Sequence, residues 1–312
     1  GHGFATYQVT ILLDDETDLA MKFLDMGTNY RAFVNEDTIL SVGQIGISAE
    51  ESIPRYEPQV VDFNAVADTM HLTIQVSNFH HRRGGAWEPI YLGLEEDIRA
   101  MRRNALLWDI FLFGSVFMMS LYHVGLFVIR RTDRSMLFFG LFCLLIAIRV
   151  TTTVEIFFIE VFPDLNWDLL VKLEYVSFYL AVPLFGSFLY CLFPTAWGER
   201  IARAAHYIAL IFTLFVLVFP VSIASYSIPI FQVITVGLCG FAFTYLLRFT
   251  LAGRPGSAVI FSGFIVLVIS VLNDILSNQE IIDSIALAPM GIFLFCFSQA
   301  FMLSTRVGAA FI

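Results

Sequence analysis

Charged residues are scarce in this chain: Asp, Glu, Lys and Arg together account for 14% of its 312 residues. In a soluble domain about a quarter of the residues are charged. Here 58% of the residues are apolar and 33 of them are phenylalanine. The net charge of −9 leaves no basic surface for nucleic acid. This composition argues against an ordinary soluble enzyme, excludes a nucleic-acid partner, and predicts a protein in contact with membrane lipid.

Cysteine is also rare, and the usual catalytic motifs are missing. The four cysteines all lie in apolar runs, and no two of them have C-x-x-C spacing, so we expect neither a disulfide framework nor a metal site. The sequence has no phosphate-binding loop, no H-E-x-x-H and no G-x-S-x-G. We therefore expect no catalytic residues, metal or cofactor within these residues, although a longer protein could carry an enzymatic module.

The charges that are present divide the chain into two parts. Residues 1–104 contain 16 acidic and 8 basic residues, whereas residues 105–312 contain 11 acidic and 10 basic residues. We predict an acidic sensor domain over residues 1–104 and a membrane domain over residues 105–307. No signal peptide precedes the first strand-like residues, so we expect a mature or trimmed chain.

Seven apolar segments are long enough to cross a bilayer, which takes about 20 helical residues. They are residues 106–129, 135–158, 169–193, 204–224, 228–249, 257–277 and 286–305. Turn-forming residues separate most of them, but the fourth and fifth almost run together around Pro220 and Pro229. The membrane domain is therefore predicted to be an all-α bundle of seven spans.

Basic residues gather at one end of these spans. Those that follow the first, third, fifth and seventh spans are Arg130, Arg131, Arg134, Arg200, Arg203, Arg248, Arg254 and Arg306. By the positive-inside rule this face is cytoplasmic, although Arg99, Arg102 and Arg103 precede the first span on the other side. We expect the amino-terminal domain outside the cell membrane. Residues 308–312 would then begin a cytoplasmic linker to an output module absent from this chain.

Residues 4–98 have the pattern of short strands separated by turns. The segment 71–77 alternates polar and apolar residues, which places Leu72, Ile74 and Val76 on one face. Four further segments are rich in strand-forming residues: 7–13, 30–34, 60–63 and 90–94. No helical pattern appears before residue 95. We predict an all-β, jelly-roll-like sandwich of at least five strands.

Several short motifs carry a resemblance to a known family. In the first part they are Thr6-Tyr7, Tyr30 with Phe33-Val34-Asn35, Gly43 with Gly46, and Gln75-Val76-Ser77-Asn78-Phe79 before Gly84-Gly85. In the second part they are Leu121-Tyr122-His123, the run Arg131–Gly140, and Ala147-Ile148-Arg149. In this order, with seven spans, they resemble bacterial seven-transmembrane receptors with diverse intracellular signalling modules.

The resemblance implies an architecture and a role. In that family a periplasmic jelly-roll domain related to carbohydrate-binding modules precedes the seven helices. The last helix leads to a kinase, a nucleotide cyclase or a phosphatase. It implies a multi-pass protein of the bacterial inner membrane with its carboxyl end in the cytoplasm.

Polar residues in the outer half of the spans form the first candidate site. They come from several spans but lie at similar depths: Asp109, Arg149, Glu155, Glu174, Asn273 and Asp274. Because an ionised group in hydrocarbon is costly, we expect Arg149 to pair with Glu174 or Asp274. Such a polar layer either locks helix packing or relays a signal.

The second candidate site is on the sandwich. The residues expected to bind a ligand are Tyr30, Asn35, Asn78, His80, His81, Arg82 and Trp87. The basic segment His80–Arg83 could instead be an exposed loop or lie over the membrane surface. The acidic run at residues 14–18 lacks the spacing of a calcium loop, and a solvated turn is the better interpretation.

The function expected from these features is that of a bacterial sensory receptor. Its sandwich would bind a small molecule such as a carbohydrate and bias the helices toward one state. A homodimer would allow a small helix rotation to carry the signal to the cytoplasmic module. Two alternatives stay open: a transporter or channel lined by Arg149, Glu174 and Asp274, and a membrane-anchored glycan-binding module.

Overall fold

The computed structural model of the chain describes residues 2–13, 18–64, 69–86, 89–131, 133–278, 281–282, 284 and 287–309. It separates into two units. The sandwich unit comprises Gly1–Asp109, Val150–Glu174 and Phe215–Ile228, and the helical unit comprises Ile110–Arg149, Tyr175–Leu214 and Pro229–Ile312. Each unit therefore draws on segments that are far apart in the sequence. The predicted domain boundary between residues 104 and 105 falls inside one continuous helix, and the domain limits stay a prediction.

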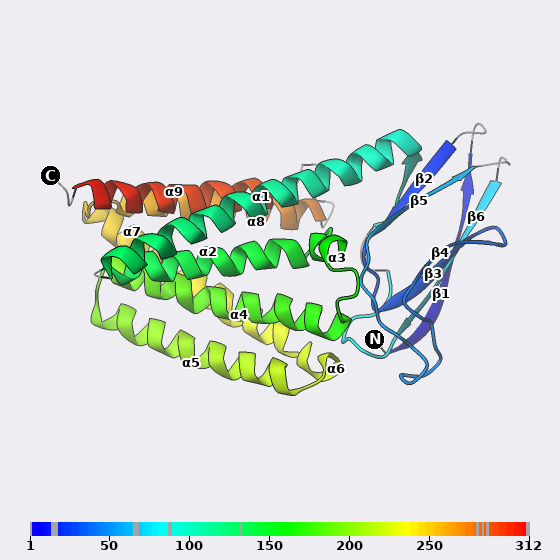
Figure 1. Cartoon of the computed structure of the whole chain (residues 1–312), viewed down its shortest axis with the longest axis horizontal. Helices are drawn as coiled ribbons and strands as arrows, with labels where there is room; N and C mark the ends of the chain where they lie inside the picture. The colour runs from blue at the N-terminus through cyan, green and yellow to red at the C-terminus, as the bar shows by residue number, and fades with distance from the viewer. Residues whose placement is uncertain are drawn as a thin grey trace. The chain divides into compact units, whose positions relative to one another are not determined.

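The described strands of the sandwich unit form two antiparallel sheets. They are β1 Gly3–Leu12, β2 Asp18–Phe23, β3 Asn29–Val34, β4 Asp37–Val42, β5 Gln59–Asn64, β6 Thr69–Asn78 and β7 Tyr91–Leu94. One sheet has the order β1-β6-β3-β4 and the other the order β5-β2-β7. Figure 1 shows them as the two layers of the sandwich. The predicted all-β sandwich is confirmed, whereas its jelly-roll topology stays a prediction.

The core of the sandwich lies between the two sheets. Tyr30 and Ala32 of β3 are fully buried, as are Met21 and Phe23 of β2. The predicted inward face of β6 is confirmed, since Leu72, Ile74 and Val76 are each at most 4% exposed. Alternation along the strands thus sorts these side chains to one face.

Strands β2 and β4 were not among the five predicted segments. β2 is buried from its second residue to its last, because one face meets the other sheet and the opposite face is covered by the rest of the sandwich unit. A strand buried on both faces loses the alternation on which the prediction rested. β4 follows β3 through a two-residue turn in which Asn35 has a φ of 55°. A turn was predicted at residues 35–37, but the strand after it was not.

The helices begin where the sandwich ends. They are α1 Glu95–Arg130, α2 Arg134–Thr152, α3 Phe157–Val161, α4 Trp167–Leu192, α5 Ala196–Val218, α6 Val221–Ala224, α7 Ser227–Leu251, α8 Ser257–Asn278 and α9 Ala288–Ala309. α1 starts directly after β7, and its first turn carries three acidic residues that stabilise the helix amino terminus. The predicted helical bundle is confirmed.

Five of the helices are long and apolar enough to cross a membrane: α1, α2, α4, α5 and α7. In α8 and α9 the apolar stretches of described residues are shorter, at Ser257–Asn273 and Pro289–Leu303. All seven lie where the sequence predicts a span, so the chain is a multi-pass membrane protein.

Two predicted spans end earlier than expected. The second span was predicted to reach residue 158, but α2 ends at Thr152 and a turn follows, with positive φ at Val154 and Ile156. The fourth was predicted to reach residue 224, but α5 ends at Val218, before Pro220. Val154 and Ile156 are as apolar as the helix before them, so apolar composition hid the first break, whereas Pro220 marks the second.

Aromatic rings fill the centre of the helical unit around α4. Phe185 of α4 lies 5.5 Å from Phe142 of α2, 6.3 Å from Phe264 of α8 and 5.3 Å from Phe295 of α9, measured between ring centroids. One turn or more away, Tyr179 of α4 contacts rings of α5 and α7. The abundance of phenylalanine therefore reflects packing between helices as well as contact with lipid.

Candidate functional site

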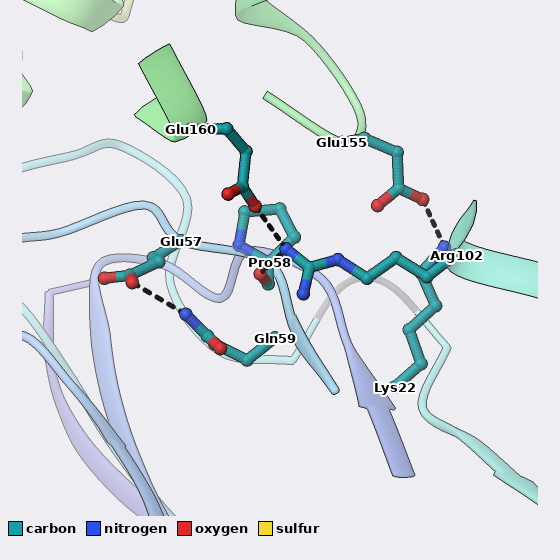
Figure 2. A network of polar contacts seen from close by, with 7 residues as sticks. All are labelled: Lys22, Glu57, Pro58, Gln59, Arg102, Glu155 and Glu160. Atoms are coloured by element: carbon teal, nitrogen blue, oxygen red, sulfur yellow. Dashed lines mark hydrogen bonds and ion pairs between the residues drawn. The ribbon is translucent and has the colours of Figure 1, made fainter. Parts of the chain in front are cut away.

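A buried ion pair joins a strand of the sandwich unit to the turn between two helices. The Nζ atom of Lys22 on β2 bonds the Oε1 atom of Glu155, and the two side chains are 6% and 1% exposed. Figure 2 shows the two side chains meeting end to end. Charges so deeply buried are rare unless paired, because removing an ion from water costs several kcal/mol.

Local structure explains why both groups point inward. Met21 and Phe23 face the sandwich core, so the alternation of β2 places Lys22 on the opposite face. Glu155 lies in the turn after α2, between Val154 and Ile156, whose positive φ values reverse the chain. The pair forms where that turn covers the second face of the β5-β2-β7 sheet.

A second carboxylate lies near this pair. Asp109 of α1 is within electrostatic range of both Glu155 and Lys22. The Oδ2 atom of Asp109 and the Oε2 atom of Glu155 are buried and have no hydrogen-bond partner among the residues that the structure describes. A single ammonium group therefore serves a site with two acids. We expect substitution of Lys22 to destabilise this cluster more than substitution of either acid.

Arg102 forms a second link beside the first. Its Nη2 atom donates to Glu160 of α3 at 2.6 Å and to the carbonyl oxygen of Pro58 at 3.0 Å (Figure 2). The residues on either side of Pro58 also bond each other: the side-chain amide of Gln59 donates to the carboxylate of Glu57 at 2.7 Å. The start of α1, the segment before β5, and α3 are thus held together by charged groups.

A pocket of about 830 Å³ opens next to this network within the sandwich unit. One wall is formed by the end of β4, the segment after it, and the loop that follows β6 at residues 79–86, called the 80s loop. Its lining residues are Ser41, Gly43, Gln44, Ile53, Pro54, Arg55, Glu57 and His80. The other wall is the α3–α4 connection with the start of α4: Pro163, Asp164, Leu165, Asn166, Trp167 and Asp168. Its size is that of a small-molecule site, and Glu57 belongs both to the pocket and to the network.

Trp167 anchors the α3–α4 wall of the pocket. It is 9% exposed, and its ring packs edge-on against Tyr56 at 5.5 Å and against His80 at 6.3 Å. His80 is itself fixed by Ser52, whose hydroxyl lies 2.9 Å from Nε2. The two walls therefore touch through the rings of His80 and Trp167.

The predicted ligand residues of the sandwich lie in different places. His80 lines the pocket, whereas Tyr30 is fully buried against Phe23. Burial raises the pKa of Tyr30 above its usual value, and nearby Asp25 and Glu57 add to the rise. Asn35 holds the β3–β4 turn by accepting a hydrogen bond from the backbone N–H of His71 at 3.0 Å.

The 80s loop is organised by Asn78. The side-chain amide of Asn78 donates to the carbonyl oxygens of His81 at 2.6 Å and Arg83 at 2.9 Å, and its oxygen accepts from the backbone N–H of His81 at 3.0 Å. His81 is 7% exposed, and burial lowers its pKa to about 4. The backbone N–H of Arg82 donates to the hydroxyl of Ser225 at 3.1 Å. Trp87 lies outside the described residues.

The predicted polar layer divides between the two units. Asp109 and Glu155 belong to the cluster around Lys22 in the sandwich unit. In the helical unit, the guanidinium carbon of Arg149 lies 5.0 Å from the centroid of the Phe178 ring, and Asn273 accepts a hydrogen bond from Ser284 at 2.8 Å. Pairing of Arg149 with Glu174 or with Asp274, whose side chain is not described, stays a prediction.

Sequence reasoning missed two residues of the site. Lys22 lies in a segment for which no strand was predicted, and its partner is 133 residues away. Arg102 was noticed only as an exception to the charge rule, yet it pairs with Glu160, and its neighbour Arg99 pairs with Asp62 and Glu95. The signal that could have found Lys22 is its rarity, since the chain has only one other lysine, Lys172.

Comparison with known proteins agrees with this architecture. The model of the family described as 7TM diverse intracellular signalling matches residues 105–306, well over half of the chain. No curated protein matches the chain closely enough to be named as a relative. The matched range contains five of the seven apolar helices in full, and it also covers most of α1 and of α9. The chain therefore belongs to the 7TM diverse intracellular signalling family of transmembrane sensory proteins.

Proposed function

We propose that this chain is the sensing and relay part of a bacterial receptor, in which a small ligand binds in the pocket of the sandwich unit. The observation that carries the proposal is the buried Lys22–Glu155 pair, because it joins a strand of the sandwich to the turn that ends α2. The family supports the sensory role, and the pocket supplies a place for a ligand beside the pair.

The relay would begin at the two walls of the pocket. A ligand held between the segment 53–57 and the α3–α4 connection would draw the two walls together. Movement of that connection is movement of α3, which carries Glu160 and follows directly after Glu155. Because α2 and α4 continue from these segments into the helical unit, displacement of α3 would bias the helices.

The lining of the pocket favours a neutral, hydroxyl-rich ligand such as a carbohydrate. Gln44 and Asn166 offer both donors and acceptors, Asp164 offers an acceptor, and Trp167 offers an aromatic surface. Most of the lining side chains are polar or charged, so a ligand rich in hydrogen-bonding groups suits this pocket better than an apolar one. The ligand can shift the receptor only as far as it binds one state better than the other.

The receptor would lie in the bacterial inner membrane, with the sandwich unit in the periplasm and α9 leading to a cytoplasmic cyclase, kinase or phosphatase. The basic residues of the loops after α1, α4 and α7 support this orientation.

A binding experiment on the full chain in lipid nanodiscs tests the ligand site. A panel of neutral monosaccharides and disaccharides is titrated while thermal unfolding is followed, and a binding sugar should raise the midpoint by a few degrees. The variants Asp164→Ala and Asn166→Ala should abolish the rise, whereas Glu36→Ala, in the exposed β3–β4 turn, should leave it unchanged.

Two results would count against the proposal. A sugar that binds equally well to the Asp164→Ala and Asn166→Ala variants does not use this pocket. Accumulation of a labelled sugar inside proteoliposomes that contain the chain would instead support the transporter alternative.

A further inference from the structure

The first strand has an open edge and is unusually exposed. β1 is the outermost strand of the β1-β6-β3-β4 sheet, and it pairs with β6 over all ten residues without a register shift. Eight of its ten residues are exposed. Among them Phe4 is 67% exposed, Val9 50% and Leu12 78%. One row of backbone N–H and C=O groups of β1 therefore has no neighbouring strand in the described part of the chain.

Part of this exposed surface belongs to the inner face of the sandwich. In an antiparallel pair, residues directly opposite each other point to the same face. Tyr7 lies opposite Ile74, and Val9 lies opposite Leu72. Ile74 and Leu72 are 4% exposed, whereas Tyr7 is 46% and Val9 50% exposed. The inner face of the sheet thus continues onto β1, where the β5-β2-β7 sheet does not cover it.

The edge of β1 also lacks the features that normally prevent pairing. Exposed edge strands usually carry a charge, a proline or a bulge. The sequence of β1, GFATYQVTIL, contains no charged residue and no proline, and its ladder with β6 is regular. By contrast the β3–β4 ladder at the opposite side of the sheet has a register shift between Ala32 and Phe33.

The sequence of β1 complements itself when it is reversed about Gln8. In an antiparallel pair of two copies centred there, Phe4 faces Leu12 and Tyr7 faces Val9. The remaining pairs are Ala5 with Ile11, Thr6 with Thr10, and Gln8 with itself. Every apolar side chain meets an apolar one, and every polar side chain meets a polar one, which are the pairs that stabilise sheets.

Neighbouring registers lose this match. Only shifts by an even number of residues keep the inner faces of both copies on the same side. Centred on Tyr7, the pairing sets Phe4 opposite Thr10, and centred on Val9 it sets Leu12 opposite Thr6. The register centred on Gln8 is therefore the one in which both large exposed end residues are matched.

We propose that β1 is a dimerisation strand, which pairs antiparallel with β1 of a second copy of this chain about a two-fold axis at Gln8. The two four-stranded sheets would form one continuous sheet, and the uncovered inner-face residues Tyr7 and Val9 of each copy would pack across the axis. Such an interface is self-complementary and closed, as a two-fold dimer requires. It goes beyond the proposed ligand site and does not depend on it.

Cysteine cross-linking of the full chain in membranes tests the register. In a background without the four native cysteines, Gln8→Cys should form a disulfide-linked dimer under mild oxidation. Residues directly opposite in an antiparallel ladder have Cα atoms about 4.5–5.5 Å apart, within the range of about 4.4–6.8 Å that a disulfide needs. Thr6→Cys alone should not cross-link, because it lies about 14 Å along the strand from its own copy. Thr38→Cys, exposed on the edge strand β4, should not cross-link either.

Charge substitutions at the same position supply an independent measurement. Gln8→Lys places two lysines opposite each other and should reduce the dimer fraction at least several-fold in chemical cross-linking or light scattering, as should Gln8→Glu. Co-expression of the two variants should restore a mixed dimer. The proposal is overturned if Gln8→Cys gives no dimer, as when another segment or another protein occupies the edge. It is overturned as well if Thr6→Cys and Thr38→Cys cross-link as efficiently as Gln8→Cys.

Discussion

At the scale of single residues, the buried cluster depends on Lys22. A buried ion pair contributes little net stability compared with an apolar pair of the same size, but removing one partner leaves an unpaired buried charge. Because Asp109 lies near Glu155, loss of the ammonium group leaves two acids without a cation among the described residues. The cluster therefore ties the fold of the sandwich unit to the charge on one side chain.

Replacing Lys22 with Met should lower the free energy of unfolding of the sandwich unit by about 3–5 kcal/mol. Hydrogen exchange of the β2 amides in nanodiscs measures this change. The matched control is Lys172→Met, since Lys172 pairs with the partly exposed Asp168 at 2.8 Å and should cost about 1 kcal/mol or less. Equal effects of the two substitutions would contradict the special role of Lys22. The double variant Lys22→Met/Glu155→Leu should recover most of the loss.

His81 provides a prediction about pH. Its pKa is lowered to about 4 in the folded chain, against about 6.5 in an unfolded chain. Between these values the unfolded state binds more protons, so stability rises with pH and is lost as pH falls. Local opening of residues 78–86 should become easier by up to about 3 kcal/mol from pH 6.5 to pH 4. Hydrogen exchange measures it, and the His81→Gln variant should lack this dependence.

The residues of the site were predictable only in part. Glu155 and Asp109 were found because a carboxylate within an apolar segment is costly. Lys22 was not, because its burial results from a pairing between parts of the chain 133 residues apart. Tyr30 and Asn35 were expected to bind a ligand, yet one fills the core and the other holds a turn, and no local pattern separates these roles.

At the scale of elements, the spacing of apolar segments predicted where helices lie but not where they break. The turn Thr153–Ile156 contains no glycine or proline, so nothing in its composition marks the end of α2. β2 was missed for a similar reason, since it is buried on both faces. Elements with one exposed face, such as β6, were predicted with their orientation.

Close packing of helices gives a prediction at this scale. A Cβ atom added at Gly140 of α2 would lie 2.8 Å from Cγ2 of Val124 and 3.1 Å from its backbone nitrogen. Gly140→Val should therefore separate α1 from α2 and destabilise the helical unit by about 1–3 kcal/mol. Gly125→Ala is the control, because nothing lies within 4 Å of its added Cβ. In thermal unfolding Gly140→Val should lower the midpoint and Gly125→Ala should not; unchanged midpoints in both would contradict the packing.

At the scale of the whole molecule, the sequence predicted the class of protein from composition and the order of its parts. The orientation in the membrane follows from the charge rule alone and is open to test. In whole cells of a cysteine-free variant, Glu36→Cys in the β3–β4 turn should react with a membrane-impermeant thiol reagent. Arg254→Cys in the α7–α8 turn should react only after the membrane is permeabilised. The reverse pattern would place the sandwich unit in the cytoplasm.

In the proposed mechanism, the Lys22–Glu155 pair transmits the state of the sandwich unit to the helices. Electron-spin distance measurements between labels at Arg131 and Arg254, both exposed residues of the helical unit, test it most directly. Lys22→Glu and Glu155→Lys should each shift the distance distribution, and the charge-swapped double variant should restore it. An unchanged distribution in both single variants, with the sandwich unit still folded, would contradict the claim.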